Sequence, residues 1–213
     1  RRTAERILQT SLALFNRYGE PGVSTAQISG ELNISPGNLY YHFPAKDVLV
    51  NALFDQYVGQ LNELLPAAPE VSDVENAWFF LHALFELVWQ YRFLYRDVNH
   101  LLSNNRHLEQ SMKNVLLDKT SAFKSLLQGL GHSGVLNLEP SDRDDLAVHM
   151  VVMLTWWLSY EYVRDPRHAM ADEYAQRSVL RGALHVMGLL LPHLDAPSRA
   201  HLKQLQSAYM PDT

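Results

Sequence analysis

The feature that most constrains this chain is a helical spacing of apolar residues along almost its whole length. No segment alternates apolar and polar residues for long, and no Asn-Gly or Asp-Gly pair marks a hairpin turn. Proline and glycine, which end helices, divide the chain into segments of helical length. These breakers fall at 19–22, 66–69, 129–134, 140, 165–166 and 192. The sequence therefore predicts an all-α protein.

Charge is divided unevenly along the chain. The 213 residues include 18 Lys and Arg against 23 Asp and Glu, a formal net charge of -5 that argues against a uniformly basic nucleic-acid-binding surface. Residues 1–48, however, carry five basic and four acidic side chains, a net of +1, which leaves -6 for residues 49–213. The acidity therefore excludes a basic coat but not a small DNA-contacting face in the first quarter.

Several classes of chemistry lack the residues they need. The chain has no cysteine, so disulfides, thiolate metal sites and cysteine nucleophiles are excluded. No two histidines are four residues apart, and there is no Glu-x-x-His pair, nucleophile elbow, P-loop or dinucleotide fingerprint. We therefore expect no metal, no cofactor and no enzyme activity. The longest apolar run without Asp, Glu, Lys or Arg, Leu146–Tyr160, is shorter than the roughly 20 residues of a membrane helix, so we expect a cytoplasmic protein without a membrane partner.

Three helices are predicted near the N-terminus. Gly19 follows an apolar stripe and suits the left-handed end of a first helix. Ser24 and Gln27 form a capping box for a second helix, and Ser35 followed by Pro36 is a typical start for a third. Two short helices joined by such a turn make a helix-turn-helix, whose second helix can enter the major groove of DNA.

The third predicted helix, residues 36–43, separates its side chains onto two faces. Leu39, Tyr40 and Phe43 are expected to face the core. The opposite face allows close backbone approach, hydrogen bonds to bases and phosphates, and contact with a thymine methyl group. It consists of Gly37, Asn38, Tyr41 and His42. The alternative interpretation is a packed protein surface with no ligand.

Lys46 begins a fourth helix, expected at about 46–65. The helix dipole does not favour a cation at this end. A phosphate held jointly by Lys46 and the free backbone N–H groups would explain the residue. The sequence thus predicts a phosphate anchor next to the third helix.

Several spaced residues together resemble the signature of the tetracycline-repressor (TetR) family. They are Ile34–Leu49 (ISPGNLYYHFPAKDVL), preceded by Leu14-Phe15, Tyr18-Gly19, Thr25 and Ile28. The resemblance covers about residues 5–53. It implies a three-helix DNA-binding head, residues 1–48, and a larger helical ligand-binding and dimerisation domain, residues 49–213, with the fourth helix as the link. The implied function is sequence-specific transcriptional regulation by a repressor that a small-molecule effector releases from DNA.

The resemblance also implies roles for single residues. Thr25 and Lys46 match phosphate contacts, and Tyr40 matches a position that combines packing with a phosphate contact. The outer face of the third helix becomes the recognition surface. Ala26 stands where family members often carry a polar or basic DNA-contacting side chain, which leaves the operator sequence open.

Beyond residue 70 the resemblance fades, and aromatic residues crowd into 78–95 and 156–162. Aromatic side chains bury large areas, so one interpretation is a core. The other is an apolar pocket with a few polar groups, which predicts a ligand with substantial apolar surface. The candidate ligand contacts are Trp78, His82, Phe85, Trp89, Arg96, His100, Trp156 and Tyr160. Arg96 would pair with a ligand carboxylate; in the alternative, Arg92 and Arg96 form salt bridges to nearby acids.

The helices expected at about 142–164 and 172–191 have more apolar positions than one buried stripe needs, and Gly182 and Gly188 allow close helix approach. The sequence therefore predicts a homodimer with these two helices of each subunit in a four-helix interface. A two-fold dimer would place two recognition helices about 34 to 36 Å apart on palindromic double-stranded DNA. Two alternatives stay open: a helical small-molecule-binding protein or enzyme whose head does not bind DNA, and a protein-interaction module that has lost DNA binding.

Overall fold

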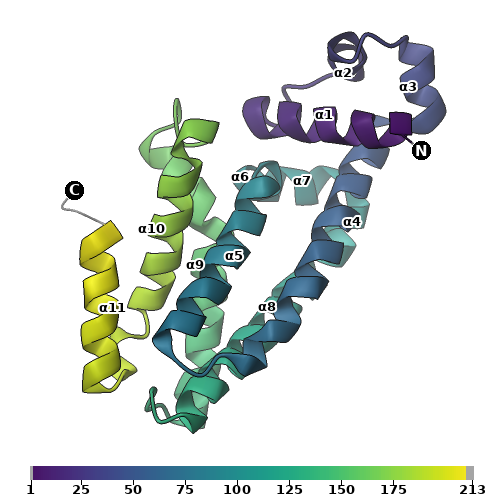
Figure 1. Ribbon diagram of the computed structural model, residues 1–213. Coiled ribbons are helices and arrows are strands. Elements are labelled where there is room, and N and C mark those ends of the chain that lie inside the picture. Colours follow the sequence, from purple (N-terminus) through teal and green to yellow (C-terminus); the bar gives the residue numbers. More distant parts are fainter. Residues whose placement is uncertain (1, 210–213) are drawn as a thin grey trace.

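The computed structural model describes residues 2–209, which form a small head joined to a longer helical body (Figure 1). The head contains α1 (Arg2–Tyr18), α2 (Thr25–Glu31) and α3 (Pro36–His42). From the head, α4 (Lys46–Leu64) continues into the body (Figure 1). Within the described residues no strand forms. The predicted all-α class is confirmed.

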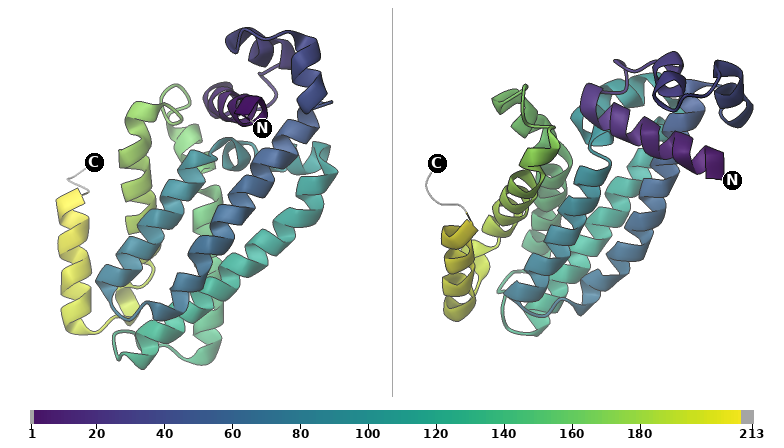
Figure 2. Two further views of the ribbon diagram at one scale, coloured as in Figure 1. Left: turned by 45° about the vertical axis from the view of Figure 1, so that its right-hand side comes forward. Right: turned by 45° about the horizontal axis from the view of Figure 1, so that its top comes forward.

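The body is a helical bundle in which α8 packs on α9 and α10 packs on α5. Both views in Figure 2 place α11 at the outer edge, beside α10 and away from α4. Short 3-10 turns, named η, join several helices. The elements are α5 (Val74–Gln90), α6 (Phe93–Arg96), α7 (Val98–Asn104), α8 (Arg106–His132), α9 (Pro140–Arg164), α10 (Ala175–Gly188) and α11 (Ala196–Tyr209), with η1 (Leu65–Glu70), η2 (Asp172–Tyr174) and η3 (Leu191–His193).

The head helices begin and end where the local sequence predicts. Ser24 Oγ accepts a hydrogen bond from the Gln27 backbone N–H at 3.1 Å, and Ser35 Oγ accepts one from the Asn38 backbone N–H at 3.2 Å. Gly19, directly after α1, has φ +80°, in the left-handed region that glycine adopts without strain. The predicted starts of α2 and α3 and the predicted end of α1 are confirmed.

Two boundaries in the body differ from the prediction. The loop placed at 129–134 begins later, because α8 continues to His132. Gly129 instead lets α8 pack closely on the chain after η1, since a Cβ at this position would lie 2.4 Å from the Val71 backbone oxygen. The single helix predicted at 172–191 is shorter, because η2 and η3 flank α10 on either side.

A continuous core joins the head to the body. Phe15 of α1 is fully buried against Phe93 of α6, with ring centroids 5.4 Å apart. Leu49 and Val50, at the start of α4, are also buried. The head is therefore packed on the body and is not attached through α4 alone.

Candidate DNA-binding surface, polar clusters and dimer face

The outer face of α3 presents the residues predicted as a recognition surface. Tyr41 is 84% exposed, Asn38 is exposed, and the rings of Tyr41 and His42 meet edge to face with centroids 5.1 Å apart. A Cβ on Gly37 would touch only Ser35 Oγ, at 3.9 Å, so packing within the protein does not require a glycine there. The missing side chain leaves the α3 backbone open to close approach, as insertion into a groove needs.

Tyr40 does not face the core as predicted. It is 47% exposed, whereas Leu39 and Phe43 are buried. The reason is a 3.0 Å hydrogen bond between the Tyr40 hydroxyl and Thr25 Oγ1, which holds the ring along the surface towards the start of α2. Two hydroxyls bonded to each other keep further donor and acceptor capacity, so the pair is chemically suited to a phosphate oxygen.

Lys46 is held by the protein itself, which the sequence patterns did not reveal. Its ammonium donates to the backbone oxygens of Glu20 (2.9 Å) and Val23 (3.0 Å) and lies 2.8 Å from the Glu20 carboxylate. The lysine thus ties the start of α4 to the loop between α1 and α2. Lys46 also lines a cleft of about 610 Å³ with Thr25 and Tyr40, so the three predicted phosphate contacts lie together. Their contact with DNA stays a prediction.

Three aromatic residues predicted as ligand contacts pack helices against each other. Phe85 and Trp89 of α5 are buried, and the Phe85 ring lies over Gly182 of α10, where a Cβ would be 2.4 Å from it. Trp78 stacks on Tyr209 of α11 with ring centroids 5.9 Å apart. These contacts favour the core interpretation for the three side chains.

The other predicted ligand contacts lie elsewhere. His82 is half-buried and its Nδ1 lies 3.7 Å from the Glu86 carboxylate, while His100 is exposed on α7. Trp156 and Tyr160 are exposed on α9. The contact of these four side chains with a ligand stays a prediction.

The body contains a buried polar cluster that the sequence patterns did not reveal. Lys119 of α8 is 1% exposed, and its ammonium donates a 2.5 Å hydrogen bond to the Tyr95 hydroxyl of α6. The Tyr95 hydroxyl also bonds to the hydroxyl of Tyr57 on α4. The ammonium lies 4.7 Å from the ring centre of Tyr95 and 5.7 Å from that of Tyr57. We call Tyr57, Tyr95 and Lys119 the lysine cluster; within residues 2–209 no carboxylate pairs with the ammonium.

Burial of this cluster changes how its members titrate. Without a counter-ion, burial lowers the pKa of Lys119 to about 7, while burial raises the pKa values of Tyr57 and Tyr95. The lysine therefore loses charge near neutral pH, where both phenols stay protonated. Lys119 lies between Val115 and Phe123 in steps of four, on the apolar stripe of α8. A lysine in that stripe is the sequence signal that could have pointed to the cluster.

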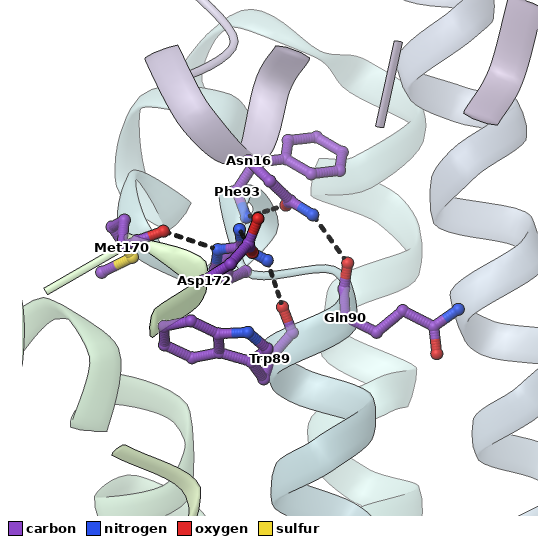
Figure 3. Close-up of polar contacts among 7 residues, drawn as sticks. Asn16, Trp89, Gln90, Phe93, Met170 and Asp172 are labelled. Carbon is purple, nitrogen blue, oxygen red and sulfur yellow. Dashed lines mark hydrogen bonds and ion pairs between the residues drawn. The ribbon is translucent and has the colours of Figure 1, made fainter. Parts of the chain in front are cut away.

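One amide side chain fixes the end of α1 to the body (Figure 3). Asn16 is buried and donates from Nδ2 to the Gln90 backbone oxygen at 2.8 Å. Its Oδ1 accepts a hydrogen bond from the Phe93 backbone N–H at 3.1 Å. Gln90 ends α5 and Phe93 begins α6, so Asn16 spans the turn between them. An amide that both donates and accepts across one turn fixes the orientation of α1 as well as its position.

Arg92 lies in the same turn and connects it to the segment before α10. Its Nε donates to the Met170 backbone oxygen at 3.1 Å, its Nη1 to the Trp89 backbone oxygen at 3.2 Å, and its Nη2 to Asp172 Oδ1 at 2.6 Å. Figure 3 shows Trp89, Met170 and Asp172 converging on this point. Burial lowers the pKa of Arg92, and the Asp172 carboxylate opposes that shift. The alternative of a salt bridge from Arg92 to a nearby acid is confirmed. We call Asn16, Arg92 and the residues that they bond the junction cluster; these partners are Trp89, Gln90, Phe93, Met170 and Asp172.

Arg96 lies next to this cluster in a mixed environment. Its Nε is 3.3 Å from the Asp97 carboxylate but forms no hydrogen bond, and its Nη2 is 3.4 Å from the Tyr162 hydroxyl. The guanidinium also stacks over the Tyr162 ring, 4.6 Å from its centre. The alternative of a salt bridge to a nearby acid is confirmed for Arg96, and its contact with a ligand stays a prediction.

Two protein-family models match the chain, one over the head and the start of α4 and the other over most of the rest of the body. One, described as bacterial regulatory proteins of the tetR family, matches residues 7–53, and the other, TetR, described as a bacterial transcriptional repressor, matches residues 56–202. The chain belongs to the TetR family. The resemblance in the first quarter is thus confirmed, and membership extends over the body, where no motif revealed it.

Several solved structures and curated proteins similar to this TetR-family chain are also transcriptional regulators by name or share its fold. A TetR-family transcriptional regulator from Marinobacter aquaeolei VT8 has a TM-score of 0.82 at 27% identity, with 98% of this chain and 99% of that chain covered. A putative transcriptional regulator from Saccharomonospora viridis shares the fold, with a TM-score of 0.66, 20% identity, and 88% and 94% covered. The Transposon Tn10 TetC protein of Escherichia coli is 25% identical over 106 residues, 50% of this chain and 48% of that protein. The chain spans between 19% and 63% of the length of the curated relatives it matches.

One side of α9 in this TetR-family chain is apolar and exposed. Its members are spaced by four, four, four and three residues, which places them on one side of the helix. All are at least 40% exposed: Val148, Val152, Trp156, Tyr160 and Val163. An uncovered row of large apolar side chains typically marks a surface that another molecule covers. We call this row the α9 stripe.

The apolar residues of α10, predicted in the same interface, are used inside the chain. Leu184 and Val186 are fully buried, because α10 packs against α5, α9 and α11. Gly182 likewise serves a contact within the chain. The exposed residues of α10 include the polar Arg177 and His185. The apolar positions of α10 thus have packing partners inside the chain in α5, α9 and α11, and a contact of α10 with a second subunit stays a prediction.

Among residues 2–209 no group of three or more His, Asp or Glu side chains is placed to hold a metal ion. No helix in the same range is long and apolar enough to cross a membrane.

Proposed function

We propose that this chain is a homodimeric transcriptional regulator that binds a palindromic DNA site through α3 and releases it when a small-molecule effector binds. The observation that carries the proposal is the exposed outer face of α3 beside the cleft of Thr25, Tyr40 and Lys46. An amide, a phenol and an imidazole can hydrogen-bond to base edges, and the hydroxyls in the cleft suit phosphate oxygens. Membership of a family described as transcriptional repressors supports the same function.

Tyr41 offers the sharpest test because its high exposure makes it dispensable for folding. Tyr41→Ala is expected to weaken binding to DNA from upstream of the protein's own gene by about tenfold to a hundredfold, the range that corresponds to one lost base contact. Fluorescence anisotropy over a series of salt concentrations measures the loss. Phe79→Ala, at an exposed aromatic residue of α5, is the matched control. Unchanged binding by Tyr41→Ala at every salt concentration would contradict DNA contact through the outer face of α3. A wild-type chain that binds no DNA would leave a helical ligand-binding protein as the function.

A second copy of the chain is the proposed cover of the α9 stripe. The stripe runs from Val148 to Val163, about 22 Å along the helix, and a two-fold axis would place it against itself. Val152→Glu combined with Trp156→Glu should convert a dimer to a monomer in sedimentation velocity, and should weaken binding to a palindrome more than binding to one half-site. Leu117→Glu, at a lone exposed leucine of α8, is the control. A double variant that stays dimeric would place the interface elsewhere.

The effector is proposed to act on the body. Proteins of the same fold have been solved with small molecules: the Saccharomonospora viridis regulator in complex with choline, and SmeT in complex with triclosan. A thermal-shift screen of apolar and polar metabolites, followed by DNA release in the anisotropy assay, identifies the class of effector. A response to small polar metabolites alone would contradict the largely apolar effector that the aromatic segments predict.

A further inference from the structure

The junction between head and body contains a cleft of about 940 Å³ that lies apart from the α3 face and the α9 stripe. It is bordered by α1, α6 and the loop that precedes α10, and Asn16, Met170 and Asp172 of the junction cluster form part of its wall (Figure 3). The volume is within the roughly 300–1,000 Å³ range of small-molecule sites. A molecule bound here would touch the head and the body at once.

Arginines determine the charge of this cleft. Its basic lining residues are Arg17, Arg92, Arg96 and Arg167, and its acidic lining residues are Asp172 and Glu173. Asp172 already pairs with Arg92 at 2.6 Å, and Asp97, outside the lining, lies 3.3 Å from Arg96 Nε. Within the described residues, the unpaired charges of the lining are then Arg17 and Arg167 against Glu173. The cleft therefore has an excess of positive charge, although the chain as a whole is acidic.

Three of the four guanidinium groups have donors to spare. Arg17 and Arg167 form no ion pair within residues 2–209, and Arg17 instead lies 5.1 Å from the ring centre of Tyr18. The Nε of Arg96 is buried without a hydrogen-bond partner. A buried N–H group without an acceptor is costly, and an acceptor brought by a ligand would remove that cost. Arg92, by contrast, uses all three nitrogens within the protein.

We propose that the cleft binds a small organic anion with at least two carboxylate or phosphate groups, held between Arg17 of the head and Arg96 and Arg167 of the body. Guanidinium groups bind carboxylates and phosphates through two parallel hydrogen bonds. The three arginines come from three separate elements. A ligand with two or more anionic groups can therefore accept hydrogen bonds from all three guanidinium groups better than a ligand with one. The Tyr162 hydroxyl and the Gln9 amide supply neutral hydrogen-bonding groups in the same lining.

An anion in this position bridges α1 to the body beside the hydrogen bonds of Asn16. It stabilises the head orientation of this structure, so its binding changes the affinity for DNA. By linkage, DNA changes the affinity for the anion by the same factor. This coupling rests on the proposed function, whereas the binding of the anion does not.

Isothermal titration calorimetry of the full chain without DNA tests the binding. Citrate and succinate are the probes, and succinamide is the uncharged match to succinate. Citrate should bind more tightly than succinate, succinamide should not bind, and added salt should weaken both anions. Arg17→Gln and Arg167→Gln should each weaken citrate binding by about tenfold or more, because each removes one charge-assisted contact. Arg106→Gln, at an exposed arginine of α8, is the control and should bind citrate as the wild type does.

Hydrogen exchange distinguishes a bridge from general charge attraction. Citrate should slow amide exchange at the end of α1 and in the loop at 165–171 together. Absence of citrate binding at millimolar concentration, equal losses in Arg106→Gln and Arg17→Gln, or protection on only one side of the cleft would overturn the proposal. If the protein binds citrate but not DNA, the anion site is supported and the proposed function as a regulator is contradicted. If it binds DNA but not citrate, the proposed function is supported and the anion site is contradicted.

Discussion

The junction cluster and the lysine cluster each bury a cation, and they differ in what surrounds it. Two backbone oxygens and the Asp172 carboxylate surround Arg92. Lys119 meets two phenols and, within the described residues, no carboxylate. Burial lowers the pKa of both cations, but Asp172 opposes the shift at Arg92 and nothing opposes it at Lys119. Arg92 is therefore expected to add stability, and Lys119 to reduce it and make it depend on pH.

The clusters also differ in what they connect. The junction cluster joins residues 74 to 80 positions apart, from α1, the turn after α5 and the segment before α10. The lysine cluster joins α4, α6 and α8, which share an apolar core in any case. Directional hydrogen bonds at the junction thus select one arrangement of head and body, whereas the packing of α4 on α8 does not require a lysine.

The largest effect is expected from Arg92→Met, which replaces the guanidinium with a shorter, unbranched apolar side chain and removes its hydrogen bonds. The Met170 backbone oxygen would lose the guanidinium donor, and the turn would lose its link to Asp172. We expect the free energy of unfolding in urea to fall by about 3 kcal/mol. Arg106→Met, at an exposed arginine, should change it by less than about 0.5 kcal/mol. Similar small changes in both variants would remove the contrast between the clusters.

The second largest effect, a gain in stability, is expected from Lys119→Met. Lys119→Met removes an uncompensated buried charge and keeps a similar volume, while Tyr57 and Tyr95 keep each other as partners. We expect the free energy of unfolding at pH 7 to rise by about 2 kcal/mol. Lys113→Met, at an exposed lysine of the same helix, is the control and should have little effect. A strong loss of stability in Lys119→Met would show that the ammonium is needed where it lies.

The same lysine predicts how wild-type stability depends on pH. Between its folded pKa of about 7 and its ordinary value of 10.5, the unfolded chain binds more protons than the folded one. The free energy of unfolding should therefore rise with pH, by at most about 1.4 kcal/mol per unit, and Lys119→Met should flatten this rise. Measurements belong between about pH 7 and 9, because above this range the tyrosines, whose pKa values burial raises, ionise first in the unfolded chain and act in the opposite direction.

A smaller loss is expected from Asn16→Ala. The substitution leaves the Phe93 backbone N–H without its acceptor and removes the donor to Gln90. We expect the free energy of unfolding to fall by about 1.5 kcal/mol, with faster hydrogen exchange in α1. Asn114→Ala, at an exposed position of α8, is the matched control. If exchange in α1 stays at the wild-type rate, core packing alone holds the head.

The smallest effect is expected from Asp172→Asn. The Asp172 side chain is 89% exposed, so water screens its charge, and the amide oxygen of asparagine can still accept from Arg92. We expect a loss of no more than about 0.5 kcal/mol in urea unfolding, similar to that of Glu173→Gln beside it. A loss as large as that of Arg92→Met would show that the carboxylate, and not the backbone oxygens, holds the arginine.

The head was predictable because its signals act over three or four residues. Ser24 and Ser35 bond to backbone N–H groups three positions on, and Gly19 ends α1 by its own backbone angle. Tyr40 was placed wrongly because its direction depends on Thr25, fifteen positions away. Local patterns determine where a helix begins, but not where a hydroxyl finds its partner.

The body was less predictable because its contacts join distant segments. Asn16 meets residues more than 70 positions away, and nothing near Asn16 in the sequence indicates them. Aromatic density predicted a pocket, yet it has several causes: Phe85 packs against α10, whereas Trp156 and Tyr160 lie in the exposed α9 stripe. Composition alone does not separate a core, a pocket and an interface.

Asn16 binds only main-chain atoms of its two partners. The exposed side chain of Gln90 can therefore change without altering either bond. Position 16 has no such freedom, because aspartate lacks the donor and glutamine has a longer reach. In evolutionary terms, the polar link between α1 and this turn concentrates its sequence requirement in one position. Descendants of this chain are expected to keep the asparagine while the turn that it holds diverges.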